Sequence, residues 1–197
     1  MKKTLFTVLF VALAAVSASA QNMFLKPMVG GTLSTLTGDI DHAKMKFGVV
    51  GGAEFGYMLS PEFAVTAGAL VSMQGASADD DVFTKDFKTT LTYLNIPIMA
   101  NYYVAPGLAI KAGVQPGFML SRKTTYTDLD DNVDVEITGT SGMKSFDLSI
   151  PLGVSYEISD FVIDARYNLG LTNIYNTDNA KVKNSVIMLT VGYKIPF

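Results

Sequence analysis

The feature that most restricts the fold is an alternation of apolar and polar residues that recurs in eight segments of the chain. The segments span residues 24–35, 47–58, 63–74, 93–104, 108–121, 146–158, 161–172 and 185–197. A period of two residues predicts a β-strand with one apolar and one polar face. Segments of about 12 residues exceed the usual strand of a soluble protein and suit a tilted membrane crossing.

The sixth and eighth segments show the pattern most fully. In the sixth, one face carries Phe146, Leu148, Ile150, Leu152, Val154, Tyr156 and Ile158, and the other carries Asp147, Ser149, Pro151, Gly153, Ser155 and Glu157. In the eighth, residues 187, 189, 191, 193, 195 and 197 are all apolar or aromatic. Across all eight segments the apolar face holds no charged residue, as contact with hydrocarbon requires.

The polar face decides whether water or lipid surrounds such a barrel. A lipocalin-like barrel also has eight alternating strands, but its polar face meets water. A water-exposed surface is about 25–35% charged, whereas only about one in six positions of this face is charged. Those eight residues, four basic and four acidic, are predicted to line the lumen: Lys26, Glu54, Lys111, Asp147, Glu157, Asp164, Arg166 and Lys194. The sequence therefore favours an all-β, eight-stranded, antiparallel, up-and-down transmembrane β-barrel.

The connections between the segments alternate in length. Residues 60–62, 105–107 and 159–160 have the composition of tight turns. Residues 36–45, 75–92, 122–145 and 173–184 are long, polar stretches and are predicted to be loops. Bacterial outer-membrane barrels have short periplasmic turns and long outer loops, so both ends of the barrel domain are predicted to face the periplasm. Six aromatic residues beside the short turns suggest an interfacial girdle: Tyr57, Phe63, Tyr102, Tyr156, Phe161 and Phe197.

Four prolines, at positions 27, 97, 116 and 151, fall inside predicted strands. Proline removes a hydrogen-bond donor from the ladder and is normally confined to edges and bulges. Because a closed barrel has no edge, we expect β-bulges at Pro97, Pro116 and Pro151.

The first 20 residues are predicted to be a secretory signal peptide. They contain the basic residues Lys2 and Lys3, an apolar run over residues 4–16 and the small residues Ala18, Ser19 and Ala20. Cleavage before Gln21 would leave residues 21–197 as one barrel domain. The chain has no cysteine, which excludes disulfides, thiol catalysis and thiolate metal sites. It has no basic patch or Trp and a net charge of −3, so nothing points to nucleic acid.

Two short stretches share the pattern Leu-polar-Ile-Pro-aliphatic, from Leu94 to Ile98 and from Leu148 to Leu152. In this element the chain resembles the small outer-membrane β-barrels of Bacteroidetes, a group labelled "porin family" or PorT-like. Thr190, Gly192, Ile195 and Phe197 are similar to the signal that the outer-membrane insertion machinery reads. The resemblance implies a Gram-negative cell outer membrane as the location and lipid, lipopolysaccharide and the insertion machinery as partners. The group is functionally mixed, and some of its members serve protein secretion.

Three sets of residues are candidates for chemistry. His42, the single histidine, lies near Asp39, Asp41 and Ser34, and its alternatives are a general base for lipid hydrolysis or a solvated side chain. Two acidic clusters, at residues 79–81 and 128–136, are either solvated loops or bind a divalent ion that bridges to lipopolysaccharide. The second cluster departs from the EF-hand pattern at Val133 and Gly139. The lumen charges are either a selective channel or an ion-pair network that fills the barrel.

The leading hypothesis is a monomeric, non-enzymatic barrel without cofactor, which presents four long loops to extracellular ligands or envelope proteins. A narrow, porin-like pore for small solutes is the second hypothesis, and a lipid-modifying enzyme is the third. The interior of an eight-stranded barrel is just wide enough for side chains to fill it. This size favours the structural network over the channel.

Overall fold

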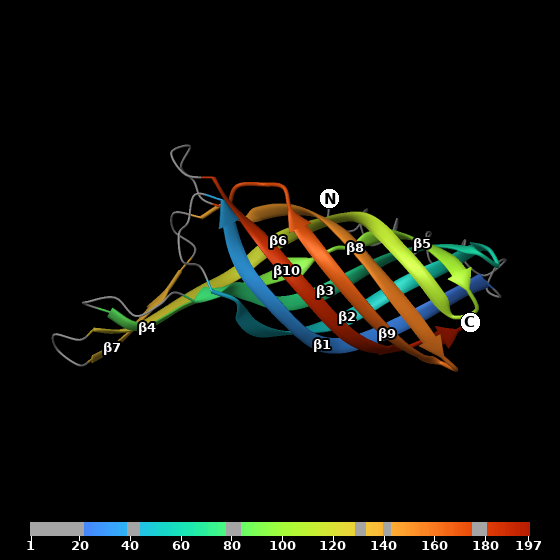
Figure 1. Ribbon diagram of the computed structural model, residues 1–197, viewed down its shortest axis with the longest axis horizontal. Helices are drawn as coiled ribbons and strands as arrows, with labels where there is room; N and C mark the ends of the chain where they lie inside the picture. Colours follow the sequence, from blue (N-terminus) through green and yellow to red (C-terminus); the bar gives the residue numbers. More distant parts are fainter. Residues whose placement is uncertain (1–21, 39–43, 78–83, 129–132, 140–142, 175–180) are drawn as a thin grey trace, which may run out of the picture.

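The computed structural model describes residues 22–38, 44–77, 84–128, 133–139, 143–174 and 181–197. These residues form a single antiparallel sheet that closes on itself (Figure 1). The described part of the chain contains no helix long and apolar enough to cross a membrane. The predicted signal peptide lies outside the described residues.

The chain runs along the barrel wall from one end to the other eight times, as the alternation predicts. Six crossings are single strands, and two are interrupted pairs, β4 with β5 and β10 with β11. The strands are β1 (Met23–Gly38), β2 (Lys46–Ser60), β3 (Phe63–Ser77), β4 (Thr84–Asn95), β5 (Ile98–Ala105), β6 (Leu108–Asp128), β8 (Phe146–Ile158), β9 (Phe161–Gly170), β10 (Val182–Tyr193) and β11 (Ile195–Pro196). Antiparallel pairing of β1 with β10 and β11 closes the ring.

Three two-residue turns, as expected, join strands at one end of the barrel. They are Pro61–Glu62, Pro106–Gly107 and Ser159–Asp160. Gly107 and Ser159 have positive φ angles of 76° and 55°, which lets the chain reverse within two residues. We call this the turn end, and the opposite end, where the longer connections lie, the loop end. Met23 and the C-terminal strand β11 also lie at the turn end.

The expected bulges at Pro97, Pro116 and Pro151 are wrong. Among the described residues the register shifts elsewhere, for example between Met58 and Ser60. Pro116 and Pro151 lie in unbroken register opposite Leu148 and Asn168.

Pro97 separates β4 from β5 without changing their shared register on β3 or β6. Its carbonyl oxygen still accepts from the Gly68 amide at 2.9 Å, and the Ile96 amide donates to the Pro116 carbonyl at 2.8 Å. Each proline therefore costs the ladder a donor but inserts no residue.

The prediction of a purely loop-like segment over residues 75–92 and 122–145 is also wrong. β4 begins at Thr84, β6 continues to Asp128, and β7 (Val133–Thr138) pairs with the outer half of β6. β4, β6 and β7 together form a three-stranded ribbon, which extends beyond the barrel wall at the loop end (Figure 1). The six residues of β7 do alternate, with Val133, Val135 and Ile137 at every second position, but so short a run among polar loop residues is a weak signal of a strand.

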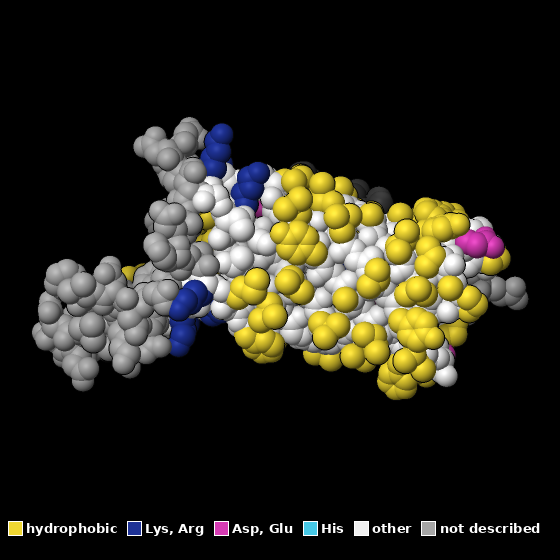
Figure 2. Space-filling view, in the orientation of Figure 1, with side chains coloured by type: hydrophobic (Ala, Val, Ile, Leu, Met, Phe, Trp, Pro, Cys, Tyr) yellow, Lys and Arg dark blue, Asp and Glu magenta, His cyan; other side chains and the backbone are white. Residues whose placement is uncertain are grey.

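Apolar side chains cover the outer wall of the barrel (Figure 2). Phe146, Leu152, Val154, Tyr156 and Ile158 of β8 are all exposed, whereas the alternate positions of that strand turn inward. Near the turn end aromatic rings pair on this surface, with Phe161 against Tyr193 at 5.2 Å and Phe55 against Phe197 at 6.3 Å between centroids. The wall is therefore an apolar band with aromatic residues at its turn end, as lipid contact requires.

Candidate functional site

Five of the eight predicted lumen charges meet in the middle of the barrel, and we call them the central network. They are Lys26 on β1, Glu54 on β2, Lys111 on β6, and Asp164 and Arg166 on β9. None of the five is more than 4% exposed. Because their side chains come from four strands and meet inside the ring, the network occupies the lumen rather than lining an open channel.

Arg166 joins the two acids of the central network. Its Nη1 lies 2.5 Å from Glu54 Oε1, while its Nε and Nη2 lie 2.5 and 2.9 Å from Asp164 Oδ1 and Oδ2. This two-nitrogen contact with one carboxylate uses the planar fork that lysine lacks. Arg166 therefore fixes the relative positions of β2 and β9 across the lumen.

Two lysines complete the central network. Lys26 Nζ lies 2.8 Å from Glu54 Oε2 and 3.7 Å from Asp164 Oδ2. Lys111 donates to Asp164 Oδ2 and lies 3.8 Å from Glu54 Oε2. Three cations thus share two carboxylates, which leaves the network with one excess positive charge in a place that water does not reach.

Glu157 and Lys194 form a separate ion pair nearer the turn end, with Lys194 Nζ 2.8 Å from Glu157 Oε2. Tyr103 donates to the other oxygen of Glu157 at 2.6 Å. Lys194 also lies 4.6 Å above the ring of Phe24, which is buried and packs over Gly56. This group of side chains lies in the lumen between the central network and the three short turns of the turn end.

Asp147, the eighth predicted charge, has no ion pair among the described residues. It instead accepts hydrogen bonds from Thr172 and, at 2.8 Å, from the Asn184 amide. Beyond it, toward the loop end, lies a cluster of buried apolar side chains: Leu36, Ala76, Leu91, Tyr93, Met119, Met143, Ile174 and Val182. No pattern in the sequence indicated this cluster: Tyr93 and Met119 lie on the polar face of predicted strands, and the other six members lie in stretches predicted to be loops.

The loop end carries the basic residues of the barrel surface. Six of them, Lys44, Lys88, Lys123, Lys144, Lys181 and Lys183, are exposed or half-exposed at strand ends, and we call them the basic collar. Figure 2 shows Lys and Arg at this end and Asp and Glu at the other. The turn connections contain two charged residues, Glu62 and Asp160, and both are acidic. Outside the lumen and the turns, the chain after residue 20 also holds twelve Asp and Glu against nine Lys and Arg, so the basic collar does not make the loop end positive overall.

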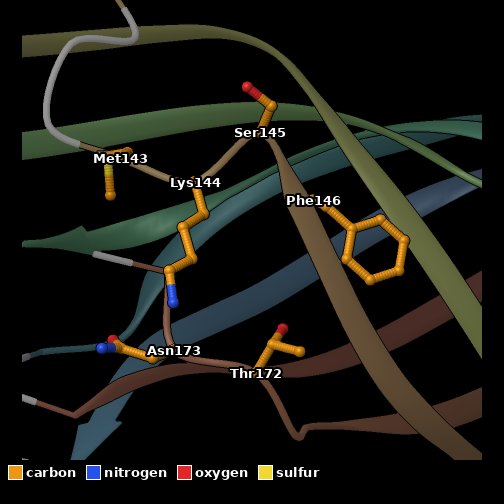
Figure 3. Close-up of a pocket in the computed structure, with 6 residues that line it drawn as sticks. All are labelled: Met143, Lys144, Ser145, Phe146, Thr172 and Asn173. Atoms are coloured by element: carbon orange, nitrogen blue, oxygen red, sulfur yellow. The ribbon is translucent and has the colours of Figure 1, made fainter. Parts of the chain in front are cut away.

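A recess of about 610 Å³ opens at the collar between the start of β8 and the end of β9. Met143, Lys144, Ser145, Phe146, Thr172 and Asn173 line it (Figure 3). The amide of Lys144 donates to the Ile174 carbonyl at 2.8 Å, and the Asn173 side chain accepts from the Val182 amide at 3.0 Å. These bonds hold the two walls of the recess in place.

The other candidate residues fall largely outside the described part of the chain. His42, Asp39, Asp41, residues 79–81 and residues 129–132 are among those that the structure does not describe. Ser34 is described: its hydroxyl is buried and donates to the Gly75 carbonyl at 2.9 Å. The described residues contain no group of three or more side chains suited to hold a metal ion.

The residues of the predicted assembly signal occupy the last crossing. Thr190 and Gly192 on β10 point into the lumen, whereas Ile195 on β11 and Phe197 beyond it are exposed on the outer wall. The signal therefore presents its apolar residues to the lipid side and its small or polar residues to the interior.

Comparison with protein families assigns the fold. The profile of a family described as outer membrane protein beta-barrel domain matches residues 19–176. The chain belongs to this family. It is thus a small outer-membrane β-barrel protein, which agrees with the closed ring, the apolar wall and the polar interior. A search of curated proteins finds no match.

Solved structures show the same architecture. Ail, the attachment invasion locus protein of Yersinia pestis, is 14% identical over 89% of this chain and 99% of its own, with a TM-score of 0.51. A second structure of Ail, in complex with the heparin analogue sucrose octasulfate, is 15% identical over 88% of this chain and 99% of its own, with a TM-score of 0.53. At such identities the likeness concerns the fold alone. Because outer-membrane barrels place their short turns toward the periplasm, we expect the loop end to be the extracellular one.

Proposed function

We propose that this protein is a closed, non-conducting outer-membrane barrel whose function lies in the extracellular surfaces that it presents. The observation that carries the proposal is the burial of the central network. Glu54 is 0% exposed and Arg166 2% exposed, although both lie in the middle of the lumen. Side chains lining a water-filled pore would remain accessible to solvent, as they do in the wider porin barrels.

Two further layers support a sealed lumen. The apolar cluster around Leu91, Met119 and Ile174 lies on the extracellular side of the network. The group formed by Phe24, Lys194 and Glu157 lies on its periplasmic side. A solute would have to displace all three layers, and the central one is held by ion pairs that are costly to break when buried.

The three-stranded ribbon supports the second half of the proposal. The outer half of β6 continues the barrel wall past Leu120, the last exposed apolar residue among the β6 side chains that the structure describes, and β7 and β4 pair with it there. Hydrogen-bonded strands hold their side chains in fixed positions, which suits a surface for a partner. Two residues of the basic collar, Lys88 and Lys123, lie on strands of this ribbon.

The proposal also covers the export of the protein, its insertion into the membrane and its place within the family. The protein is exported through a signal peptide cleaved before Gln21, is inserted through its C-terminal signal and acts as a monomer without enzymatic activity or cofactor. The Leu-polar-Ile-Pro element supports a position among the small PorT-like barrels of Bacteroidetes. In the crossing that begins with β4, this element places Pro97 at the break between β4 and β5.

Single-channel recording tests the proposal. Residues 21–197 are refolded, the folded barrel is verified by its heat-modifiable mobility on an unboiled gel, and the protein is inserted into a planar bilayer. We expect no steady openings. A variant lacking residues 128–136 should remain heat-modifiable and equally silent, because the tip of the ribbon lies outside the barrel wall. Reproducible openings of the intact protein would refute the sealed lumen and establish a narrow pore.

A further inference from the structure

We infer that β7 binds a partner protein by accepting an extended segment of that partner as a further antiparallel strand of the ribbon. The segment would carry basic side chains that alternate with apolar ones. The inference rests on the proposed function, because it specifies how the ribbon contacts a partner, but it stands whether or not the lumen conducts. Three observations support it: the pairing of β7, the direction of its backbone groups and the pattern of its side chains.

β6 is the central strand of the ribbon, and β7 lies at its side. The outer half of β6 pairs with β4 on one side and with β7 on the other. In the part of the chain that the structure describes, β7 pairs with β6 alone. A strand at the edge of a sheet presents a row of hydrogen-bonding groups with which another chain can pair. β7 lies beyond the barrel wall (Figure 1), so the wall itself does not cover this edge.

The backbone of β7 alternates between groups that bind β6 and groups that face away from it. The amide of Gly139, directly after β7, donates to the Arg122 carbonyl at 3.1 Å. In an antiparallel pair the amide and carbonyl of one residue point to the same side, and successive residues point to opposite sides. The odd-numbered residues of β7 therefore bind β6, whereas the backbone groups of Asp134, Glu136 and Thr138 face outward. These outward groups can form a new ladder.

The side chains of β7 indicate which segment would fit. Ile137 is 52% exposed although it is apolar, and Val135 on the same face is half-buried. The strand contains Asp134 and Glu136 but no basic residue. Glu136 is exposed and lies 2.8 Å from the ammonium of Lys123. Residues directly opposite each other in a sheet share a face, so an added strand should place apolar side chains beside Ile137 and basic ones beside Glu136.

A second copy of β7 does not meet this requirement. The outward backbone groups of two antiparallel copies have to face each other. In the registers with the greatest overlap, Glu136 of one copy then lies opposite Glu136 or Asp134 of the other. Like charges directly opposite each other in a sheet are destabilising. The pattern therefore selects a basic, alternating segment of a different protein.

The probes are short synthetic peptides in which valine and lysine alternate. One form is unmodified, one is N-methylated at its lysine amides, and one is N-methylated at its valine amides. The peptide residue opposite Glu136 turns its backbone toward β7, so lysine amides form the new ladder and valine amides do not. The two methylated forms have the same charge and the same apolar side chains, so they differ in backbone pairing. A fourth peptide, with glutamate in place of lysine, tests the charge pattern.

The matched variants of the protein are Thr138→Pro and Thr138→Val. Proline removes the outward-facing amide at this position and leaves those that bind β6, whereas valine keeps the amide and the branched side chain. The readouts are peptide affinity and the hydrogen exchange of backbone amides, followed by NMR on residues 21–197 refolded in detergent micelles. Slow exchange at Ile137 in a variant shows that its β7 still pairs with β6.

We expect the unmodified and valine-methylated peptides to bind the intact protein and to slow exchange at Glu136 and Thr138. The lysine-methylated peptide should bind roughly fivefold more weakly or worse, the factor for a lost hydrogen bond. The unmodified peptide should lose as much with Thr138→Pro and nothing with Thr138→Val. The glutamate peptide should bind more weakly than the lysine peptide.

Absence of peptide binding, equal binding of the two methylated forms, or greater loss with the valine-methylated form would overturn the inference. So would equal binding of the lysine and glutamate peptides. Binding that is insensitive to methylation but lost on deletion of residues 128–136 would overturn strand addition and leave the proposed function standing. Failure of the sealed lumen is detected separately, by channel openings in the planar bilayer.

Discussion

The excess positive charge of the central network predicts that its acids matter more for stability than its lysines. Glu54 contacts Arg166 at 2.5 Å, Lys26 at 2.8 Å and Lys111 at 3.8 Å. Replacing it by the isosteric glutamine leaves three buried cations on the single carboxylate of Asp164. Removing one partner of a buried ion pair costs about 3–5 kcal/mol when the remaining charge is left uncompensated. We therefore expect Glu54→Gln to lower the free energy of unfolding by about that amount.

Lys111→Met is the matched variant. It replaces the lysine by an uncharged side chain of similar length. Two cations, Lys26 and Arg166, then remain on two carboxylates. Replacement of a buried charge by a packed apolar side chain can be nearly neutral when no unpaired charge remains, so we expect a loss of about 1 kcal/mol or less. The double variant should recover part of the loss caused by Glu54→Gln, because it removes one of the cations that Glu54 had compensated.

The assay for this set is urea unfolding in lipid vesicles. The chain contains no Trp, so the folded fraction is followed by the heat-modifiable gel band and by far-ultraviolet circular dichroism. The expected order of stability is wild type, then Lys111→Met, then the double variant, then Glu54→Gln. If Lys111→Met proved as destabilising as Glu54→Gln, the imbalance of charge would not govern the network and the reasoning would fail.

Three further predictions follow from other contacts. Arg166→Ala should lower the free energy of unfolding by about 3 kcal/mol, since it contacts both carboxylates, while planar-bilayer recordings stay silent; raised conductance would show that this side chain is what seals the lumen. Gly56→Ala should cost about 1–3 kcal/mol in urea unfolding, because its new methyl group would overlap the ring of Phe24; adding Phe24→Leu should restore part of the loss, and no restoration would point to another cause. Removing the aromatic ring in Phe197→Ala should reduce the amount of barrel in outer-membrane fractions while leaving refolding into detergent unchanged; equal amounts in the membrane would argue against its part in the assembly signal.

The number of crossings and the tight turns were predictable from the sequence because each leaves a local pattern. Period-two alternation marks a strand wherever one face meets lipid and the other does not, and Pro106–Gly107 or Ser159–Asp160 marks a turn by its composition. The ribbon strands leave a weaker pattern. β7 has apolar residues at every second position, Val133, Val135 and Ile137, but it is only six residues long and lies in a stretch rich in Asp and Thr.

The pairing inside the lumen could not be read from the sequence. Lys26 and Asp164 are far apart in the chain and meet only because the sheet closes, and the same holds for Glu54 and Arg166. The prolines show the reverse case, in which a feature was predicted from the sequence but is absent from the structure. Pro116 was expected to force a bulge, but a missing donor weakens the ladder without requiring an extra residue, and the register passes through it unchanged.

The length of β6 sets the height at which this protein can be reached from outside. Eight residues of the strand, from Ser121 to Asp128, follow Leu120, the last exposed apolar side chain among those of β6 that the structure describes. At about 3.3 Å per residue and a tilt of roughly 40°, they lift the end of the strand about 20 Å above the lipid boundary. A sugar coat attached to the surrounding lipids would bury the barrel mouth before it covered that tip. A partner could therefore engage the tip without descending to the bilayer, and shortening the ribbon would hide it beneath its neighbours.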